Sequence, residues 1–135
     1  MKKKNKKYLG IIAAFSCAFA IGITANAGTI PFTICVNGSN ADTKSKREIK
    51  TSDGDTYAYF TATSYLEGSA PVTVASYKLN NTSIKTSTAT LKTTNKNVVQ
   101  KRKYGSTAQG GYYYYMEAGQ NPAYAKTKIS GRYCP

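Results

Sequence analysis

Side chains that carry acid–base and metal chemistry are scarce in this chain. It contains no histidine, so it lacks the commonest general base and the commonest zinc ligand. Catalysis by Ser-His-Asp or Cys-His arrangements is therefore excluded. A hydrolase that uses carboxylates alone needs two of them facing each other across a cleft. The spacing of the six carboxylates proposes no such pair: Asp42, Glu48, Asp53, Asp55, Glu67 and Glu117.

Two of these carboxylates, Asp53 and Asp55, flank Gly54 and have the spacing of calcium ligands. The segment is too short to supply the six oxygens that calcium requires. Because Asp-Gly accepts a positive φ, we predict a plain turn there. We expect no metal, no cofactor and no enzymatic activity, and a carboxylate-only hydrolase is the least favoured alternative.

Residues 1–27 have the three-part pattern of a secretory signal peptide. A lysine cluster at 2–7 precedes an apolar run at 9–23, and Ala25-Asn26-Ala27 closes the segment with small residues. The apolar run is about fifteen residues, shorter than the roughly 20 that a membrane-spanning helix needs. We therefore predict cleavage after Ala27, export of residues 28–135 as one domain, and no transmembrane segment after cleavage.

Export determines how the cysteines are interpreted. Cys17 would leave with the signal peptide, and Cys35 and Cys134 would remain as an even pair in an oxidising compartment. We predict a disulfide between them that joins the first and last strands. It would close a loop of about 100 residues, worth about 4.7 kcal/mol in the chain-entropy model. Two free thiols are the alternative.

Basic side chains are the main candidates for binding. Residues 28–135 hold fourteen Lys and Arg against six acids, a net charge of about +8. The candidate anion-binding residues are Lys101, Arg102, Lys103, Lys126 and Lys128. Outside a bacterium, the anionic partners are cell-wall polymers and the membrane surface, which a cationic face would attract. Nucleic acid is not expected as a dedicated target. The alternative role of these residues is solubility and protection of edge strands.

Four consecutive tyrosines at 112–115 form the second candidate site. Successive side chains of a strand point to opposite faces, so Tyr113 and Tyr115 share one face and form a candidate aromatic patch. This patch would stack against sugars, which favours a carbohydrate-binding module as an alternative function. The structural alternative is cross-strand packing on a half-buried sheet.

The elements that must position these residues are short strands. Thr29–Val36 alternates, with Phe32, Ile34 and Val36 on one side and Thr33 and Cys35 on the other. Seven further strands are predicted at 45–51, 56–66, 72–79, 82–93, 98–104, 112–118 and 124–133. Seven or eight short strands with regular turn signals predict an all-β fold, an antiparallel β-sandwich.

The predicted core is thin, because Leu, Ile, Val and Phe make up about 14% of residues 28–135. We therefore expect modest stability that depends on the disulfide.

The two ends of the exported domain carry a resemblance. It opens Ile30-Pro31-Phe32 and closes with Ser130-Gly131-Arg132-Tyr133; between them lie Lys-Arg-Glu-Ile-Lys at 46–50 and Lys103-Tyr104 before a Gly-rich turn. This pattern resembles a family of small secreted proteins of Gram-positive bacteria with no known function, whose members begin near Pro-Phe and end near Ser-Gly-Tyr-Trp. The resemblance implies a secreted β domain and no active-site residues.

Together these observations predict a secreted, cationic, non-enzymatic protein that binds anionic components of the cell envelope. One use of such binding is antibacterial, and the chain is similar in size and character to secreted β-sandwich bacteriocins of the lactococcin type.

Overall fold

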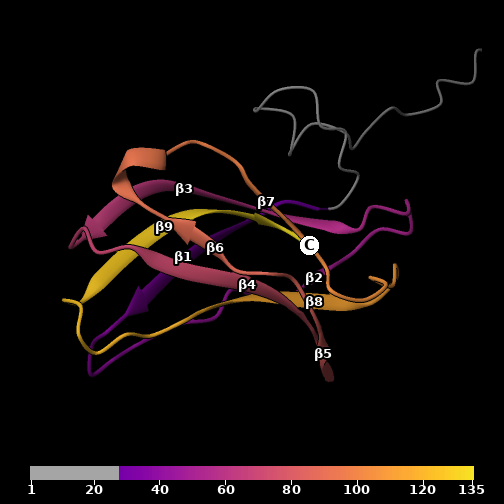
Figure 1. Ribbon diagram of the computed structural model, residues 1–135, viewed down its shortest axis with the longest axis horizontal. Coiled ribbons are helices and arrows are strands. Elements are labelled where there is room, and N and C mark those ends of the chain that lie inside the picture. Colours follow the sequence, from indigo (N-terminus) through magenta and orange to yellow (C-terminus); the bar gives the residue numbers. More distant parts are fainter. Residues whose placement is uncertain (1–27) are drawn as a thin grey trace, which may run out of the picture.

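A computed structural model describes residues 28–135, and the predicted signal peptide lies outside the described residues. The fold is all-β, as predicted, and consists of two antiparallel sheets (Figure 1). The described residues form nine strands and one short 3-10 helix: β1 (Ile30–Val36), β2 (Glu48–Ile49), β3 (Tyr57–Glu67), β4 (Val72–Lys78), β5 (Asn81–Lys85), β6 (Ala89–Leu91), η1 (Thr93–Asn95), β7 (Gln100–Lys103), β8 (Tyr113–Ala118) and β9 (Thr127–Cys134).

The chain moves between the sheets more often than it turns back on itself. Sheet A has the strand order β1-β9-β3-β7, and sheet B has the order β2-β8-β4-β5, with β6 also paired to β4. Of the strands that follow each other in sequence, β4 and β5 pair as a hairpin, closed by Asn80 at φ 67°. The turn at Asp53-Gly54 instead leads from β2 in sheet B to β3 in sheet A. It is therefore a turn, as predicted, but it connects two sheets.

The core lies between the sheets and follows the predicted alternation. In β1, the side chains of Phe32, Ile34 and Val36 are buried in it. Sheet A adds Ala58, Phe60, Ala62, Ile129 and Tyr133, and sheet B adds Val72, Val74, Ala89, Leu91, Tyr114, Met116 and Ala118. The predicted long strand at 82–93 is divided into β5 and β6, which pair with opposite ends of β4.

Tyrosines supply the volume that the few aliphatic residues do not. The rings of Phe60 and Tyr133 stack with centroids 5.6 Å apart, and those of Tyr104 and Tyr114 meet edge to face at 5.3 Å. A buried phenol needs a hydrogen-bond partner. Ser76 Oγ in sheet B bonds the hydroxyls of both Tyr104, at 2.7 Å, and Tyr133, at 2.5 Å. This buried hydroxyl group therefore links the two sheets.

The predicted disulfide between Cys35 and Cys134 is wrong in this structure. Cys35 pairs with Lys128 near the start of β9, whereas Cys134 ends that strand six residues further along. At about 3.4 Å per residue this separation is about 20 Å, and a disulfide requires Cα atoms within about 7 Å. Both thiols are buried. The antiparallel register, which the sequence does not reveal, places them at opposite ends of the sheet.

The first prediction follows from this register. Because Cys35 and Cys134 are not bonded to each other, the urea midpoint of unfolding should be the same with and without a reducing agent. Alkylation should add two groups at these residues once the protein is unfolded, with no prior reduction. A lower midpoint under reducing conditions, or blocked alkylation, would contradict the register.

A second prediction concerns alkaline pH. Burial raises the pKa of the phenols of Tyr104 and Tyr133, and burial together with a hydrogen bond to Asp55 raises that of Tyr59. Their pKa when unfolded is near 10.0. The stability that these neutral phenols contribute is therefore complete below about pH 10 and is lost as pH rises toward their folded pKa values.

Burial lowers the pKa of the Lys50 ammonium, offset in part by Asp55 and Asp53. The lowered pKa of Lys50 makes the protein more stable as pH rises toward 10.5. Above this pH the tyrosines with raised pKa values, including these three, make stability fall with pH. We expect cooperative unfolding in strong base, followed by circular dichroism, with the tyrosinate absorbance of several tyrosines rising in the same transition. Titration of every tyrosine near pH 10 with the fold intact would be the contrary result.

Candidate anion-binding faces

The outer face of sheet A carries two of the predicted basic residues beside two tyrosines. Strand β7 pairs with β3 so that Lys101 lies opposite Tyr59 and Lys103 opposite Tyr57. The core takes Ala58 and Phe60 of β3, so the alternate positions face outward. The Lys101 ammonium lies 4.0 Å from the ring centroid of Tyr57 and 5.8 Å from that of Tyr59. The lysine is thus held over aromatic rings while remaining exposed.

Arg132 completes this face. It lies on β9 opposite Thr61 of β3 and Pro31 of β1, and it is exposed. Arg132 is not among the predicted anion-binding residues, although the period of two along 127–134 places it on the face opposite the buried Tyr133. We call Lys101, Lys103 and Arg132 the sheet A cations.

Arg102, predicted to act with its two neighbours, points the other way. It lies opposite the buried Ala58, on the inner side of β7. Its Nε donates a 2.8 Å hydrogen bond to the carbonyl oxygen of Thr88, in the segment before β6. Arg102 therefore connects the edges of the two sheets, and the Lys101-Arg102-Lys103 run does not form one cationic surface.

Lys126 and Lys128 both lie next to an acid. The Lys126 ammonium is 3.0 Å from a Glu67 carboxylate oxygen, and Lys128 pairs with Glu67 across β9 and β3. The hydrogen bond and charge of Glu67 raise the pKa of Lys126. Their net contribution to an anion-binding surface is smaller than the sequence predicted, because part of their charge is compensated.

The outer face of sheet B carries the predicted aromatic patch. Tyr114 is fully buried in the core, and its neighbours Tyr113 and Tyr115 point outward, as the alternation requires. Tyr115 stacks on Tyr77 of the adjacent strand β4, with centroids 5.7 Å apart and planes at 22°. The cross-strand packing considered from the sequence is present for Tyr115.

Three cations lie over the rings of this face. Lys44 is 5.3 Å from the centroid of Tyr115, and Lys85 is 5.9 Å from that of Tyr77. The order across the sheet is therefore Lys44, Tyr115, Tyr77, Lys85. The Arg47 guanidinium lies 4.9 Å from the centroid of Tyr113. We call Lys44, Arg47 and Lys85 the sheet B cations; all three are exposed.

This arrangement changes the role of the tyrosines. A sugar stacks on the flat face of an aromatic ring, and those of Tyr115 and Tyr77 are in contact with each other and with lysines. The tyrosine rings instead limit the movement of the lysine and arginine side chains above them. Each exposed cation–π contact contributes about 0.5–1 kcal/mol. Six cations of the described chain lie within 6 Å of a ring centroid, whereas about one or two are typical of this length. Holding cations over tyrosines is therefore a repeated feature of this fold.

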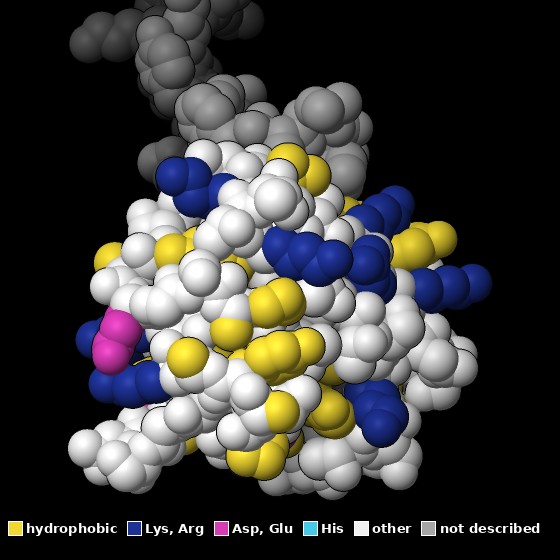
Figure 2. All heavy atoms as spheres, turned by 60° about the vertical axis from the view of Figure 1, so that its left-hand side comes forward, with side chains coloured by type: hydrophobic (Ala, Val, Ile, Leu, Met, Phe, Trp, Pro, Cys, Tyr) yellow, Lys and Arg dark blue, Asp and Glu magenta, His cyan; other side chains and the backbone are white. Residues whose placement is uncertain are grey.

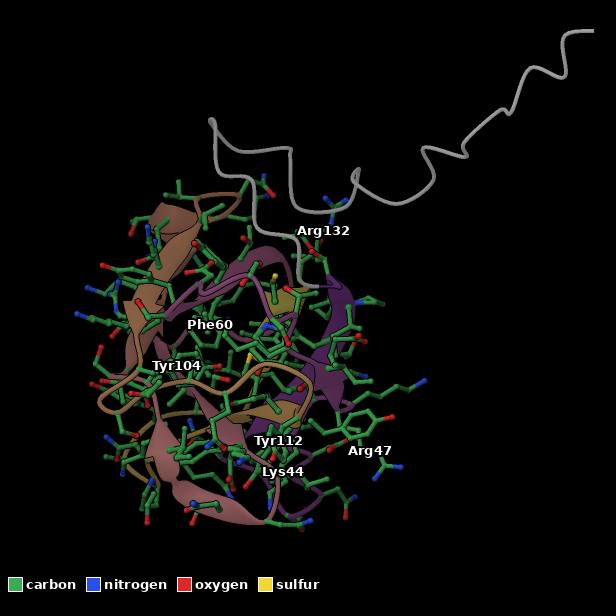
Figure 3. The ribbon with its side chains drawn as sticks, turned by 90° about the vertical axis from the view of Figure 1, so that its right-hand side faces the viewer. Lys44, Arg47, Phe60, Tyr104, Tyr112 and Arg132 are labelled. Carbon is green, nitrogen blue, oxygen red and sulfur yellow. The ribbon has the colours of Figure 1, made fainter. Side chains whose placement is uncertain are left out.

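The two groups of cations lie on opposite sides of the molecule. Figure 3 shows Arg132 at the upper side and Lys44 and Arg47 at the lower side, with Phe60 and Tyr104 of the core between them. Figure 2 shows far more basic than acidic side chains on one face of the protein.

The acids within residues 28–135 are mostly bonded to the protein itself. The Asp53 carboxylate accepts hydrogen bonds from the Thr51 hydroxyl and the Asp55 amide, and Asp55 accepts one from the Tyr59 hydroxyl. Burial raises the pKa of Asp53, but its hydrogen bonds lower it further, below its usual value. Lys44 lies 3.8 Å from Glu117, so part of its charge is compensated as that of Lys126 is, although both pairs are open to solvent and therefore weak. Across this part of the chain no three Cys, Asp or Glu side chains gather as metal ligands would.

A cluster of basic and hydroxyl side chains around Lys50 is buried in the core. Lys50 is 1% exposed, and its ammonium donates to the carbonyl oxygens of Pro135, at 3.1 Å, and Tyr57, at 3.4 Å. It lies 5.6 Å from the ring centroid of Tyr104, whose hydroxyl bonds Ser76. Ser76 is 0% exposed. This cluster supports the fold.

Comparisons with protein-family models, with curated proteins and with solved structures found no match. The resemblance to a secreted Gram-positive family therefore remains a prediction. Within residues 28–135, none of the helical structure has the length and apolar character needed to cross a bilayer.

The third prediction separates Arg102 from its neighbours. Arg102→Gln should lower the free energy of unfolding by about 1 kcal/mol, because the hydrogen bond to the Thr88 carbonyl oxygen is lost. Lys103→Gln should change it by less than about 0.5 kcal/mol, because its side chain is exposed. Lys101→Gln should lower it by about 0.5–1 kcal/mol, because the contact with the Tyr57 ring is lost. Urea denaturation of the three variants measures this. An effect of Arg102→Gln no larger than that of Lys103→Gln would show that Arg102 does not connect the sheets.

Proposed function

We propose that this protein is exported and binds anionic polymers of the cell envelope without catalysis. The observation that carries the proposal is the sheet A surface, where Lys101 and Lys103 of β7 share one outer face with Arg132 of β9, on either side of β3. Their charges are exposed, and Lys101 is held in place over two tyrosines. A fixed cation loses less conformational entropy when it binds an anion than a freely rotating one.

Phosphate-bearing polymers are the ligands whose chemistry fits best. Guanidinium presents a planar fork that matches phosphate geometry, and ammonium binds phosphate as a point charge. A net charge of about +8 on residues 28–135 adds long-range attraction to any polyanion. Such binding would also bring a bacteriocin-like protein to its target surface.

Carbohydrate stacking has less support. Among the outward tyrosines of sheet B, Tyr113 is 42% exposed, but one face of its ring contacts Arg47. A neutral sugar would have to displace Arg47 to reach that face of the Tyr113 ring.

The fourth prediction tests anion binding by adsorption. The protein should adsorb to Gram-positive cell walls at low salt and be released between roughly 0.1 and 0.5 M salt, where the Debye length falls from about 10 Å to a few ångström. The triple variant Lys101→Gln, Lys103→Gln, Arg132→Gln should adsorb more weakly and be released at lower salt.

The matched control removes three exposed lysines that belong to neither group of cations, by Lys46→Gln, Lys92→Gln and Lys96→Gln. It lowers the net charge equally and should retain more adsorption. Equal losses in the two triple variants would indicate attraction by net charge without a site. Retention on neutral polysaccharide that salt does not affect would favour the carbohydrate alternative.

A further inference from the structure

The sheet B cations form a second surface of the same kind as the sheet A cations. Each surface has two lysines and one arginine drawn from two segments of the chain, and on each at least one lysine lies over a tyrosine ring. On sheet B all three cations are held in this way. The column Lys44, Tyr115, Tyr77, Lys85 extends across three strand spacings, about 14 Å, so its two lysines can contact separate anionic groups of one linear chain.

The two surfaces face away from each other. Packed sheets lie about 10 Å apart, and side chains extend outward on both sides, so the two groups of cations are separated by about 20 Å. This distance exceeds the Debye length of about 8 Å at physiological salt. Two polyanions bound on the two faces would therefore repel each other only weakly, and the protein body would keep them from touching.

We propose that one molecule binds two linear phosphate-bearing polymer chains at once, one on each outer face, and so cross-links them. This inference rests on the proposed function, because it assumes that the sheet A surface binds anions. It adds a second site, built from Lys44, Arg47 and Lys85 with Tyr77, Tyr113 and Tyr115, and a different outcome of binding. The protein connects polymer chains rather than only coating them.

The inorganic polymer polyphosphate is a suitable probe, since it is linear, carries phosphate groups and contains no sugar. Beads coated with long-chain polyphosphate should agglutinate when the purified protein is added at low salt. Calorimetry with a short oligophosphate should give two sites per protein molecule.

Single-face variants make the test specific. The sheet A variant is the triple substitution described above, and the sheet B variant is Lys44→Gln, Arg47→Gln, Lys85→Gln. Each should bind one oligophosphate per molecule, half the wild-type number, and neither should agglutinate the beads. An equal mixture of the two variants should also fail to agglutinate them, whereas Lys46→Gln, Lys92→Gln, Lys96→Gln should agglutinate them as the wild type does.

A second sheet B variant tests the role of the rings without changing the charge. Tyr77→Leu with Tyr115→Leu leaves Lys44 and Lys85 in place but removes the surfaces that restrict them. It should weaken binding at that face and reduce agglutination, while the sheet A face still binds. Unchanged urea midpoints would show that each variant remains folded.

The outcomes separate the two proposals. Binding of polyphosphate without agglutination, or a single site in the wild type, overturns cross-linking and leaves the proposed function standing. Agglutination by either single-face variant also overturns it, because bridging would then come from association between protein molecules. Absence of any binding at low salt overturns the proposed function together with the cross-linking.

Discussion

The structure depends on how tyrosine is accommodated between the sheets. With few aliphatic side chains available, the interior is filled by the rings of Tyr104, Tyr114 and Tyr133, and each brings a hydroxyl that must be hydrogen-bonded. Ser76 bonds two of these hydroxyls, and the third is bonded by the backbone of Gln109. These bonds determine how the sheets face each other, and thereby which side of each strand is exposed.

The side chains on the outer faces follow from which tyrosines are buried. Once Tyr114 enters the core, Tyr113 and Tyr115 must point outward, and once Tyr133 is buried, Arg132 must be exposed. The exposed tyrosines then lie beside lysines and arginines that are abundant in the sequence. Their contacts convert flexible cations into positioned ones. The alternation of inward and outward side chains along β8 and β9 therefore determines both the packing between the sheets and the charge on their outer faces.

The sequence was informative where a pattern is local. The all-β class, the shared direction of Phe32, Ile34 and Val36, and the shared face of Tyr113 and Tyr115 all follow from a period of two. The same period, applied to β7, would have shown that Arg102 faces away from Lys101 and Lys103. The prediction grouped Arg102 with Lys101 and Lys103 because the three basic residues are consecutive, and it did not apply the alternation to them.

Contacts between segments distant in the sequence could not be predicted from local patterns. The pairing of Lys126 with Glu67, the stack of Tyr115 on Tyr77 and the separation of Cys35 from Cys134 depend on strand order and register, which no short motif encodes. The predicted disulfide failed for this reason: cysteines near the two chain ends need not lie near each other even on neighbouring strands. Stability therefore rests on the packed core between the sheets, including its bonded hydroxyls.

The central claim is that tyrosine rings hold cations at fixed places on the outer faces. Nuclear magnetic resonance of the lysine Hε protons tests it most directly, because a proton above a ring is shifted upfield by the ring current. We expect upfield shifts for Lys44, Lys85 and Lys101, loss of the Lys44 shift when Tyr115 is replaced by Leu, and no upfield shift for Lys46. Shifts typical of a free lysine at all three positions would contradict it.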